Sequence, residues 1–285
     1  MTVHLYTSSL NEADLLEFFF RHYDSWVDRY VVFDDGSTDE TREILSAHPR
    51  VELRDFERVD PSSFVISHTH IQNESWKESR SQADWVVVTA IDEHLQVPHL
   101  PMAEYLTRCR AEGATIIPAM GFDMISEEFP DPYEWLCETR TWGVPSHNMC
   151  KLSIFRPDQV RESGFGSGRH HAVPTGRRKS PKRDELLLLH YKYLDSERIF
   201  RRHQLLQKGL GPTDIKKRYG SEYFRSREEH LAFWKKLEET AVDLADPSFD
   251  PMRHHKDNRW WRLSWKLRYR LGRVTRPNGG VSPGR

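Results

Sequence analysis

Cysteine is scarce in this sequence, which has only Cys109, Cys137 and Cys150 among its 285 residues. An odd number of cysteines without the close pairing of metal-binding loops predicts neither a disulfide framework nor a cysteine-rich zinc module. Long apolar runs are also missing, since no stretch approaches the roughly 18 consecutive apolar residues of a membrane-spanning helix. The first residues lack the basic and then apolar pattern of a secretory signal. These absences predict a protein of a reducing, cytoplasmic compartment.

Acidic residues are missing from residues 258–285, which carry eight arginines and lysines. This tail therefore has a charge of +8 and residues 1–257 carry −9, because the formal net charge of the chain is −1. Trp260 and Leu263 belong to one apolar face of a helix expected within 258–276. Such a basic amphipathic helix suits either peripheral contact with the inner face of a membrane or packing against its own domain. The acidic remainder argues against a nucleic-acid-binding protein.

Strands and helices alternate along the first 120 residues. Apolar runs rich in β-branched residues predict strands at 2–7, 29–33, 51–56, 85–90 and 114–119. Helices are expected between them, including one across 66–82 and one near 102–111. Several strands are apolar throughout, which indicates burial on both faces, as in a parallel sheet. The pattern predicts the α/β class, with a mostly parallel twisted sheet flanked by helices.

After residue 120 the pattern loosens. Further strands are expected at 151–155 and 186–193, and further helices at 196–208 and 226–245. Residues 161–184 are rich in Gly, His, Arg and Lys and are expected to form a mobile loop. Three Ser/Glu pairs have the spacing of a helix N-terminal capping box, namely Ser9 with Glu12, Ser37 with Glu40, and Ser226 with Glu229.

Polar side chains follow several of the predicted strands at the point where each strand ends. The clusters are Thr7-Ser8-Ser9, Asp34-Asp35, Asp92-Glu93 and Asp123. Ligands of open parallel sheets bind beyond the carboxyl ends of the strands, so these residues are candidates for one site. The alternative for each cluster is an ordinary polar turn, in which an aspartate caps the backbone and the neighbouring Gly36 supplies the bend.

Two segments carry a resemblance to a known family. Ser9-Leu10-Asn11-Glu12 and the run from Val31 through Asp34-Asp35-Gly36-Ser37-Thr38-Asp39-Glu40 to Thr41 resemble the N-terminal half of family 2 glycosyltransferases with the GT-A fold. The resemblance covers roughly residues 2–205. It implies a GT-A-like catalytic domain at 1–205, followed by a helical C-terminal extension at 206–285. It also implies transfer of a sugar from a nucleotide-diphosphate donor with inversion at the anomeric carbon.

The family's acidic motif at a strand end is only partly present. Asp92 and Glu93 match it, but Ala90 stands where the family has its first acid. Gly168-Arg169-His170 and His190-Tyr191-Lys192 resemble the loop and strand that close the active site in one branch of these enzymes. The resemblance therefore implies a divalent cation, Mn²⁺ or Mg²⁺, held by Asp92 and His190, and Ala90 puts the affinity for this cation in question.

The remaining roles follow from the same resemblance and from the chemistry of the transfer. Nucleotide-sugar contacts are expected from a set of polar strand-end and loop residues, namely Thr7, Ser9, Glu12, Asp34, Asp35, Arg169 and His170. A direct displacement needs a general base for the acceptor hydroxyl, and Asp123 is the first candidate, with Glu127 and Glu128 as rivals. The expected partners are a UDP-sugar and a glycan or lipid-linked acceptor, in surface polysaccharide or glycoconjugate synthesis.

Three alternatives stay open. Ala90 motivates a non-catalytic nucleotide-sugar or glycan-binding protein on the same fold, because a lost carboxylate weakens a cation site. In a metal-independent transferase, His and Arg side chains would replace the charge of the cation. A nucleotidyltransferase is the weakest alternative, since the N-terminal segment lacks a Gly-rich basic loop for a triphosphate.

Overall fold

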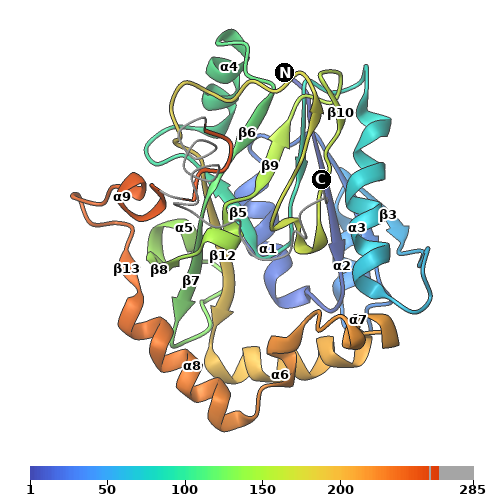
Figure 1. Ribbon diagram of the computed structural model, residues 1–285, viewed down its shortest axis with the longest axis vertical. Helices are drawn as coiled ribbons and strands as arrows, with labels where there is room; N and C mark the ends of the chain where they lie inside the picture. Colours follow the sequence, from blue (N-terminus) through green and yellow to red (C-terminus); the bar gives the residue numbers. More distant parts are fainter. Residues whose placement is uncertain (257, 263–285) are drawn as a thin grey trace, which may run out of the picture.

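The computed structural model describes residues 1–256 and 258–262 (Figure 1). Within this part of the chain a six-stranded sheet has the order β3-β2-β1-β4-β9-β6, and a five-stranded sheet has the order β13-β8-β7-β12-β5. The first sheet comprises β1 (Val3–Ser9), β2 (Arg29–Asp34), β3 (Val51–Asp55), β4 (Trp85–Val88), β6 (Ile116–Pro118) and β9 (Leu152–Phe155). The second comprises β5 (Glu93–Gln96), β7 (Met120–Ser126), β8 (Trp142–Pro145), β12 (Leu187–Leu194) and β13 (Val242–Asp243). A small hairpin-like pair joins β10 (Val160–Glu162) and β11 (Thr175–Gly176).

Helices surround these sheets and also form the end of the molecule that is lowest in Figure 1. The α-helices are α1 (Ala13–Tyr23), α2 (Thr41–Ala47), α3 (Phe64–Glu74), α4 (Met102–Ala111), α5 (Leu136–Thr139), α6 (Ser196–Gly209), α7 (Pro212–Lys216), α8 (Arg227–Thr240) and α9 (Pro251–His255). The 3₁₀ helices are η1 (Ser75–Ser79), η2 (His147–Met149), η3 (Ser167–Arg169) and η4 (Ser221–Phe224). None of the helices in the described part of the chain is long and apolar enough to span a membrane.

The first half of the six-stranded sheet is parallel. β1 pairs in parallel with both β2 and β4, and β2 pairs in parallel with β3. β9 then joins β4 and β6 in antiparallel register. The predicted α/β class, with a parallel sheet flanked by helices, is confirmed. Because β1 and β2 run in the same direction, their last residues, Ser9 and Asp34, lie opposite each other at one edge.

The two faces of this sheet bury different helices, as alternation along a strand requires. Leu5, Val32 and Val87 share one core with the aromatic face of α1 and the buried face of α4. Tyr6 and Val86 point to the other face. There they share a core with Trp76 of η1 and with Phe155 and Phe165. Burial on both faces explains why these strands read as continuous apolar runs. Each fully buried large side chain contributes about 1.5–3 kcal/mol to stability.

Two of the predicted capping boxes are wrong. Helix α1 begins at Ala13, whereas Ser9 is the last residue of β1 and its hydroxyl donates to Asp34. Helix α2 begins at Thr41, and the Ser37 hydroxyl likewise donates to Asp34. The third box is confirmed, because Ser226 and Glu229 cap the start of α8 reciprocally. The hydroxyls of Ser9 and Ser37 thus stabilise the turn around Asp34 and do not cap the helices that follow.

The five-stranded sheet is assembled from segments that are far apart in the sequence. β12 lies between β7, with which it is parallel, and β5, with which it is antiparallel. Helices α6 and α8 follow β12 and pack against its end through Ile199, Trp234 and Tyr193. The predicted division between residues 205 and 206 lies inside α6, and the division into two domains stays a prediction.

Candidate active site

Asp92, His190 and Asp123 form a contiguous cluster between the strands of the second sheet. His190 lies on β12 directly opposite Asp123 of β7 on one side and Glu93 of β5 on the other. Its Nδ1 donates to Asp123 Oδ1 at 2.7 Å, and its Nε2 lies 3.3 Å from Asp92 Oδ2. The His190 side chain is 10% exposed, and those of Asp92 and Asp123 are 23% and 17% exposed. Three residues predicted separately from the sequence therefore meet at one point.

The cluster is held together by opposite charges. Burial alone would lower the pKa of His190, but the Asp92 carboxylate and the hydrogen bond to Asp123 raise this pKa to about 9. Burial alone would raise the pKa values of Asp92 and Asp123, but His190 lowers both. At neutral pH the cluster in this structure is an imidazolium between two carboxylates.

Additional charged residues surround Asp92. The Arg202 guanidinium of α6 pairs with Glu12 at the start of α1, and Arg198 of α6 pairs with Asp14. Burial raises the pKa of Glu12 to about 7; Arg202 opposes this rise, and the negative charge of Asp92 adds to it. Lys192 follows His190 on β12 by two residues and lies within electrostatic reach of Asp92 and Asp123. The sequence showed no role for Arg198 or Arg202, because nothing in a helix of mixed charge marks which side chains meet the start of α1.

Glu93 has a different environment from Asp92, although the two are adjacent. Its carboxylate pairs with Arg169 of η3 and, at 2.7 Å, with Lys151 Nζ, and all three side chains are buried. Burial alone would raise the pKa of Glu93, but Arg169 and Lys151 hold it well below the usual range. Arg169 also donates to the Val88 carbonyl at 2.5 Å, so it fixes the end of β4.

The segment expected as a mobile loop at 161–184 contains β10, η3 and β11, and Arg169 is only 1% exposed. Most of this segment has neither helix nor strand, as a loop would, and its mobility stays a prediction; the charge of Arg169 is used internally to neutralise Glu93. We therefore do not place Arg169 against a nucleotide sugar. The next residue, His170, has a neutral side chain, because burial and the nearby Lys151 lower its pKa to about 3. Its Nδ1 lies 3.0 Å from the Asn148 carbonyl oxygen.

The two aspartates at the end of β2 also differ. Asp34 is buried and accepts hydrogen bonds from Ser9, from the backbone and side chain of Ser37, and from Arg42. This is the turn geometry weighed above as the alternative to nucleotide contact. Asp35 instead makes a single ion pair, with Arg58 at 3.0 Å, and burial raises its pKa despite that partner. Thr7 is buried on β1, the strand that pairs with β2, and is followed by Ser8.

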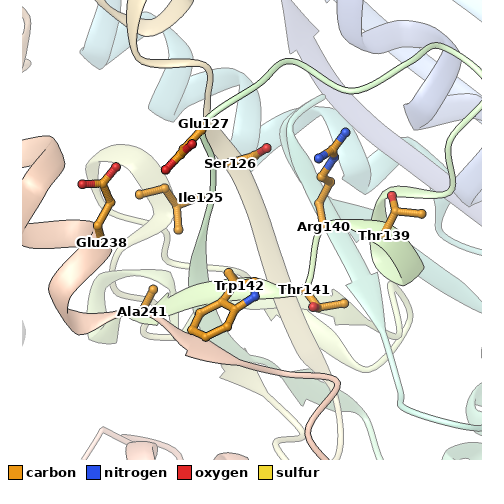
Figure 2. Close-up of a pocket in the computed structure, with 9 residues that line it drawn as sticks. All are labelled: Ile125, Ser126, Glu127, Thr139, Arg140, Thr141, Trp142, Glu238 and Ala241. Carbon is orange, nitrogen blue, oxygen red and sulfur yellow. The ribbon is translucent and has the colours of Figure 1, made fainter.

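A cavity of about 320 Å³ lies farther along β7 (Figure 2). It is lined by Ile125, Ser126, Glu127, Thr139, Arg140, Thr141, Trp142, Glu238 and Ala241. The Trp142 side chain is 54% exposed, and Figure 2 shows the carboxylates of Glu127 and Glu238 on the side away from Arg140. Since Ser126 follows Asp123 by three residues on the same strand, the cavity begins about 10 Å from the His190 cluster.

Residues 258–262, the part of the basic tail that the structure describes, pack against the rest of the protein. Arg259 and Arg262 both pair with Asp184, at 2.9 and 2.6 Å, and the Trp261 indole donates to the same carboxylate at 2.8 Å. The Trp260 indole donates to the Cys150 carbonyl at 2.9 Å. Packing, the alternative to membrane contact, therefore holds for residues 258–262. The rest of the predicted amphipathic helix lies outside the described residues.

No protein-family model and no curated protein sequence matches this chain. Among solved structures it is similar to glucosyl-3-phosphoglycerate synthase from Mycobacterium tuberculosis in complex with Mn²⁺, UDP and glucosyl-3-phosphoglycerate, at 19% identity and a TM-score of 0.33. That match covers 59% of this chain and 62% of the synthase, so less than two thirds of the synthase is spanned.

A second similar structure is a nucleotide-diphospho-sugar transferase, so named provisionally, from Desulfovibrio desulfuricans G20. Its identity is 12%, its TM-score is 0.29, and the match covers 55% of this chain and 65% of that chain. 4-Diphosphocytidyl-2C-methyl-D-erythritol synthase is similar at 12% identity and a TM-score of 0.31, over 55% of this chain and 76% of that chain. At these TM-scores the similarities carry no weight for the substrate or the mechanism of this chain.

Proposed function

We propose that this protein is an inverting GT-A glycosyltransferase, which transfers a sugar from a UDP-sugar to a hydroxyl of a glycan or lipid-linked acceptor. We place this activity in the synthesis of surface polysaccharide or glycoconjugate. The observation that supports the proposal is the Asp92–His190–Asp123 cluster beside the carboxyl ends of parallel strands, where open α/β sheets bind their ligands.

The cluster suits a divalent cation. His190 Nε2 and the Asp92 carboxylate face each other, while Asp123 occupies the other ring nitrogen of His190. A carboxylate that binds the second nitrogen of a histidine is the usual outer-shell support of a metal-bound imidazole. The mixed nitrogen and oxygen donors favour Mn²⁺ over Mg²⁺. When bound, the cation supplies positive charge for a leaving diphosphate.

Protein side chains would hold the rest of the donor. Asp35, with one ion-pair partner, and Glu12, whose pKa is about 7, are the acceptors we assign to ribose or sugar hydroxyls. We assign Lys192 and Arg202 to the diphosphate, because they bring positive charge to the neighbourhood of Asp92. Preorganised charge of this kind stabilises a leaving group without reorganisation during the reaction.

Asp123 is the residue that we propose takes the proton of the acceptor hydroxyl. Its Oδ1 is bonded to His190, so a base function and a role in orienting His190 must be separated by experiment. In an Asp123→Asn variant, loss of a base lowers kcat and leaves the affinity for Mn²⁺ and UDP unchanged. Loss of orientation weakens Mn²⁺-dependent UDP binding as well.

The cavity at Trp142 is the site that we propose for the acceptor. An exposed indole and a few carboxylates are groups that stack on and hydrogen-bond to a sugar ring, and the cavity opens along the strand that carries Asp123. Trp142→Ala should raise the KM for the acceptor about 10-fold and leave the KM for the donor unchanged. Trp135→Ala is a matched control, since Trp135 is also exposed but does not line the cavity.

One observation favours a second candidate, a nucleotide-sugar-binding protein without turnover. Ala90 removes one acid, and the ion pairs with Arg169 and Lys151 occupy Glu93, so Asp92 is the acid of this motif that is left for a cation. Incubation with a panel of UDP-sugars, Mn²⁺ and oligosaccharide acceptors separates the two candidates. Release of UDP together with a glycosylated product, lost in Asp92→Ala, supports the transferase. Tight UDP-sugar binding without any product supports the second candidate.

A further inference from the structure

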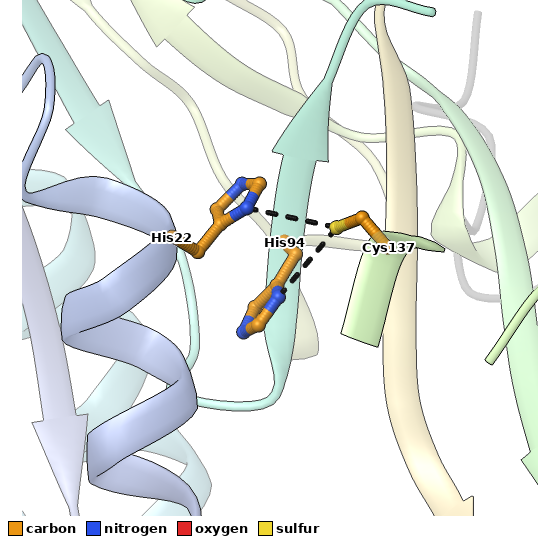
Figure 3. Close-up of side chains that lie close together, drawn as sticks. All are labelled: His22, His94 and Cys137. Atoms are coloured by element: carbon orange, nitrogen blue, oxygen red, sulfur yellow. Dashed lines mark hydrogen bonds between the residues drawn. The ribbon is translucent and has the colours of Figure 1, made fainter. Parts of the chain in front are cut away.

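A second cluster of metal-ligating side chains lies close to the first. His22 of α1, His94 of β5 and Cys137 of α5 converge in Figure 3. The Cys137 Sγ is 3.6 Å from His22 Nδ1 and 4.0 Å from His94 Nδ1, and the three ligand atoms all lie within 4.8 Å of one another. Segments separated by 72 and 43 residues are therefore brought to one point.

The hydrogen bonds of His22 fix which of its nitrogens faces the thiol. Nε2 lies 2.9 Å from the Leu95 carbonyl, and a carbonyl oxygen can only accept, so Nε2 must carry the proton. In the neutral ring the other nitrogen, Nδ1, is then a lone pair, and it lies 3.6 Å from Cys137 Sγ. A backbone carbonyl on the far nitrogen is the outer-shell arrangement of metal-bound histidines.

Without a cation the cluster holds only weak hydrogen bonds. Cys137 offers one weak S–H donor, and its sulfur lies 3.6 Å from His22 Nδ1 and 4.0 Å from His94 Nδ1. The rings of His22 and His94 stack with centroids 4.5 Å apart. The hydroxyl of the buried Tyr191 also lies beside Cys137. The Cys137 sulfur is therefore the point at which these polar side chains meet.

The distances match those around a tetrahedral zinc ion. With Zn–S of about 2.3 Å and Zn–N of about 2.0–2.1 Å, a tetrahedral angle separates sulfur from nitrogen by about 3.6 Å. The observed separations of 3.6 and 4.0 Å are close to this value, and the stacked rings of His22 and His94 would rotate on binding so that both Nδ1 lone pairs point at one ion. Two imidazoles and one thiolate select zinc or another soft divalent ion over Mg²⁺ or Ca²⁺.

We propose that His22, His94 and Cys137 bind one Zn²⁺ ion, with water as the fourth ligand, and that this ion ties α1, β5 and α5 together. Binding displaces the Cys137 proton to solvent and forms one Zn–S and two Zn–N bonds. The site is structural. Its effect on the protein is to fix β5, which follows Asp92 directly and is also held by the Tyr23 hydroxyl at the Glu93 carbonyl, 2.6 Å away.

Cobalt titration of the full chain tests this proposal without reference to enzyme activity. Chelator-treated protein is titrated with Co²⁺, whose bond to a thiolate gives a charge-transfer absorption that oxygen and nitrogen ligands do not give. We expect one Co²⁺ per chain, displaced by an equimolar amount of Zn²⁺. Cys137→Ala should abolish the band, whereas Cys109→Ala, which removes a buried thiol elsewhere, should keep it.

The same experiment separates this site from the proposed donor site. Asp92→Ala removes a ligand of the other cluster and should leave the cobalt–thiolate band intact. Should Cys137→Ala fold poorly, His94→Gln and the protection of Cys137 from a thiol-modifying reagent by Zn²⁺ report on the same ion. Absence of the band at stoichiometric Co²⁺, or an equal band in Cys137→Ala, overturns the proposal.

Discussion

Two histidine clusters flank one short strand and have opposite electrostatics. His190 lies between Asp92 and Asp123, and its pKa is raised to about 9 although burial alone would lower it. His22 and His94 lie beside a neutral thiol, and burial lowers the pKa of His22 to about 4. Similar burial gives opposite protonation states because carboxylates are present in one cluster and absent from the described surroundings of the other.

Glu93 separates the two clusters. It stands between Asp92 and His94 in the sequence, and its ion pairs with Arg169 and Lys151 keep its charge compensated. Three consecutive residues, Asp92, Glu93 and His94, thus contribute to a charged cluster, a buried ion pair and a neutral cluster. Asp92 precedes β5 and His94 lies within it, and each contacts different neighbours.

Removing Arg169 from its ion pair with Glu93 should have the largest effect on the unfolding free energy. Arg169→Met leaves the buried Glu93 with Lys151 alone, and removal of one partner from a buried ion pair costs about 3–5 kcal/mol of unfolding free energy. Urea unfolding measures this loss, with Arg178→Met as the control because Arg178 is exposed in the same segment. A loss below about 1 kcal/mol would mean that Arg169 is not needed to compensate the buried charge of Glu93.

The charged cluster should stabilise the metal-free protein in a defined pH window. Because the folded-state pKa of His190 is raised, its contribution is fully present below about pH 6.5 and is lost as the pH rises through about 9. The shift corresponds to about 3 kcal/mol. Asp123→Asn should remove much of this contribution, so its unfolding free energy should approach that of the wild type between pH 6.5 and 9.5. A constant difference across that range would contradict the raised pKa.

The neutral cluster should act in the opposite pH window. Because burial lowers the pKa of His22, the unfolded chain takes up a proton that the folded chain refuses, and stability falls as the pH decreases from about 6.5 to 4. His22→Gln should reduce this slope by at most one proton, or about 1.4 kcal/mol per pH unit. His70→Gln, at an exposed position on α3, should leave the slope unchanged. If His22→Gln leaves the pH dependence of the unfolding free energy unchanged, His22 takes up its proton as readily in the folded chain as in the unfolded chain, and its pKa is not lowered.

Much of the fold was predictable because, in the first sheet, the residues that favour strands locally are also the residues that the tertiary structure buries. Val31, Val86 and their neighbours are apolar on both faces, which marks buried parallel strands directly in the sequence. The strand β5 was missed because Glu93 and His94 are polar residues buried by pairing and stacking rather than by apolar character. The helix-capping boxes predicted at Ser9 and Ser37 were wrong because both serine hydroxyls donate to Asp34.

The members of the candidate site were found one by one, but their arrangement was not. Asp92, Asp123 and His190 were each predicted, and the pairing of β12 with β5 and β7 is what brings them together. Arg169 and Asp34 were expected to face a donor; each is buried and bonded to neighbouring residues, and their contact with a donor stays a prediction. The cluster of His22, His94 and Cys137 had no sequence signal, because its residues lie 43 or more positions apart.

Calorimetric titration of UDP, with and without Mn²⁺, into the wild type and Asp92→Ala tests the central claim most directly. The account predicts that Mn²⁺ strengthens UDP binding in the wild type and that Asp92→Ala loses about 100-fold in affinity in the presence of Mn²⁺. His4→Gln is a suitable control, since His4 is a buried histidine near the start of β1 that bonds Ser79 and lies outside the cluster. Equal affinity with and without Mn²⁺ would favour a metal-independent transferase. No UDP binding at millimolar concentration would contradict the donor site itself.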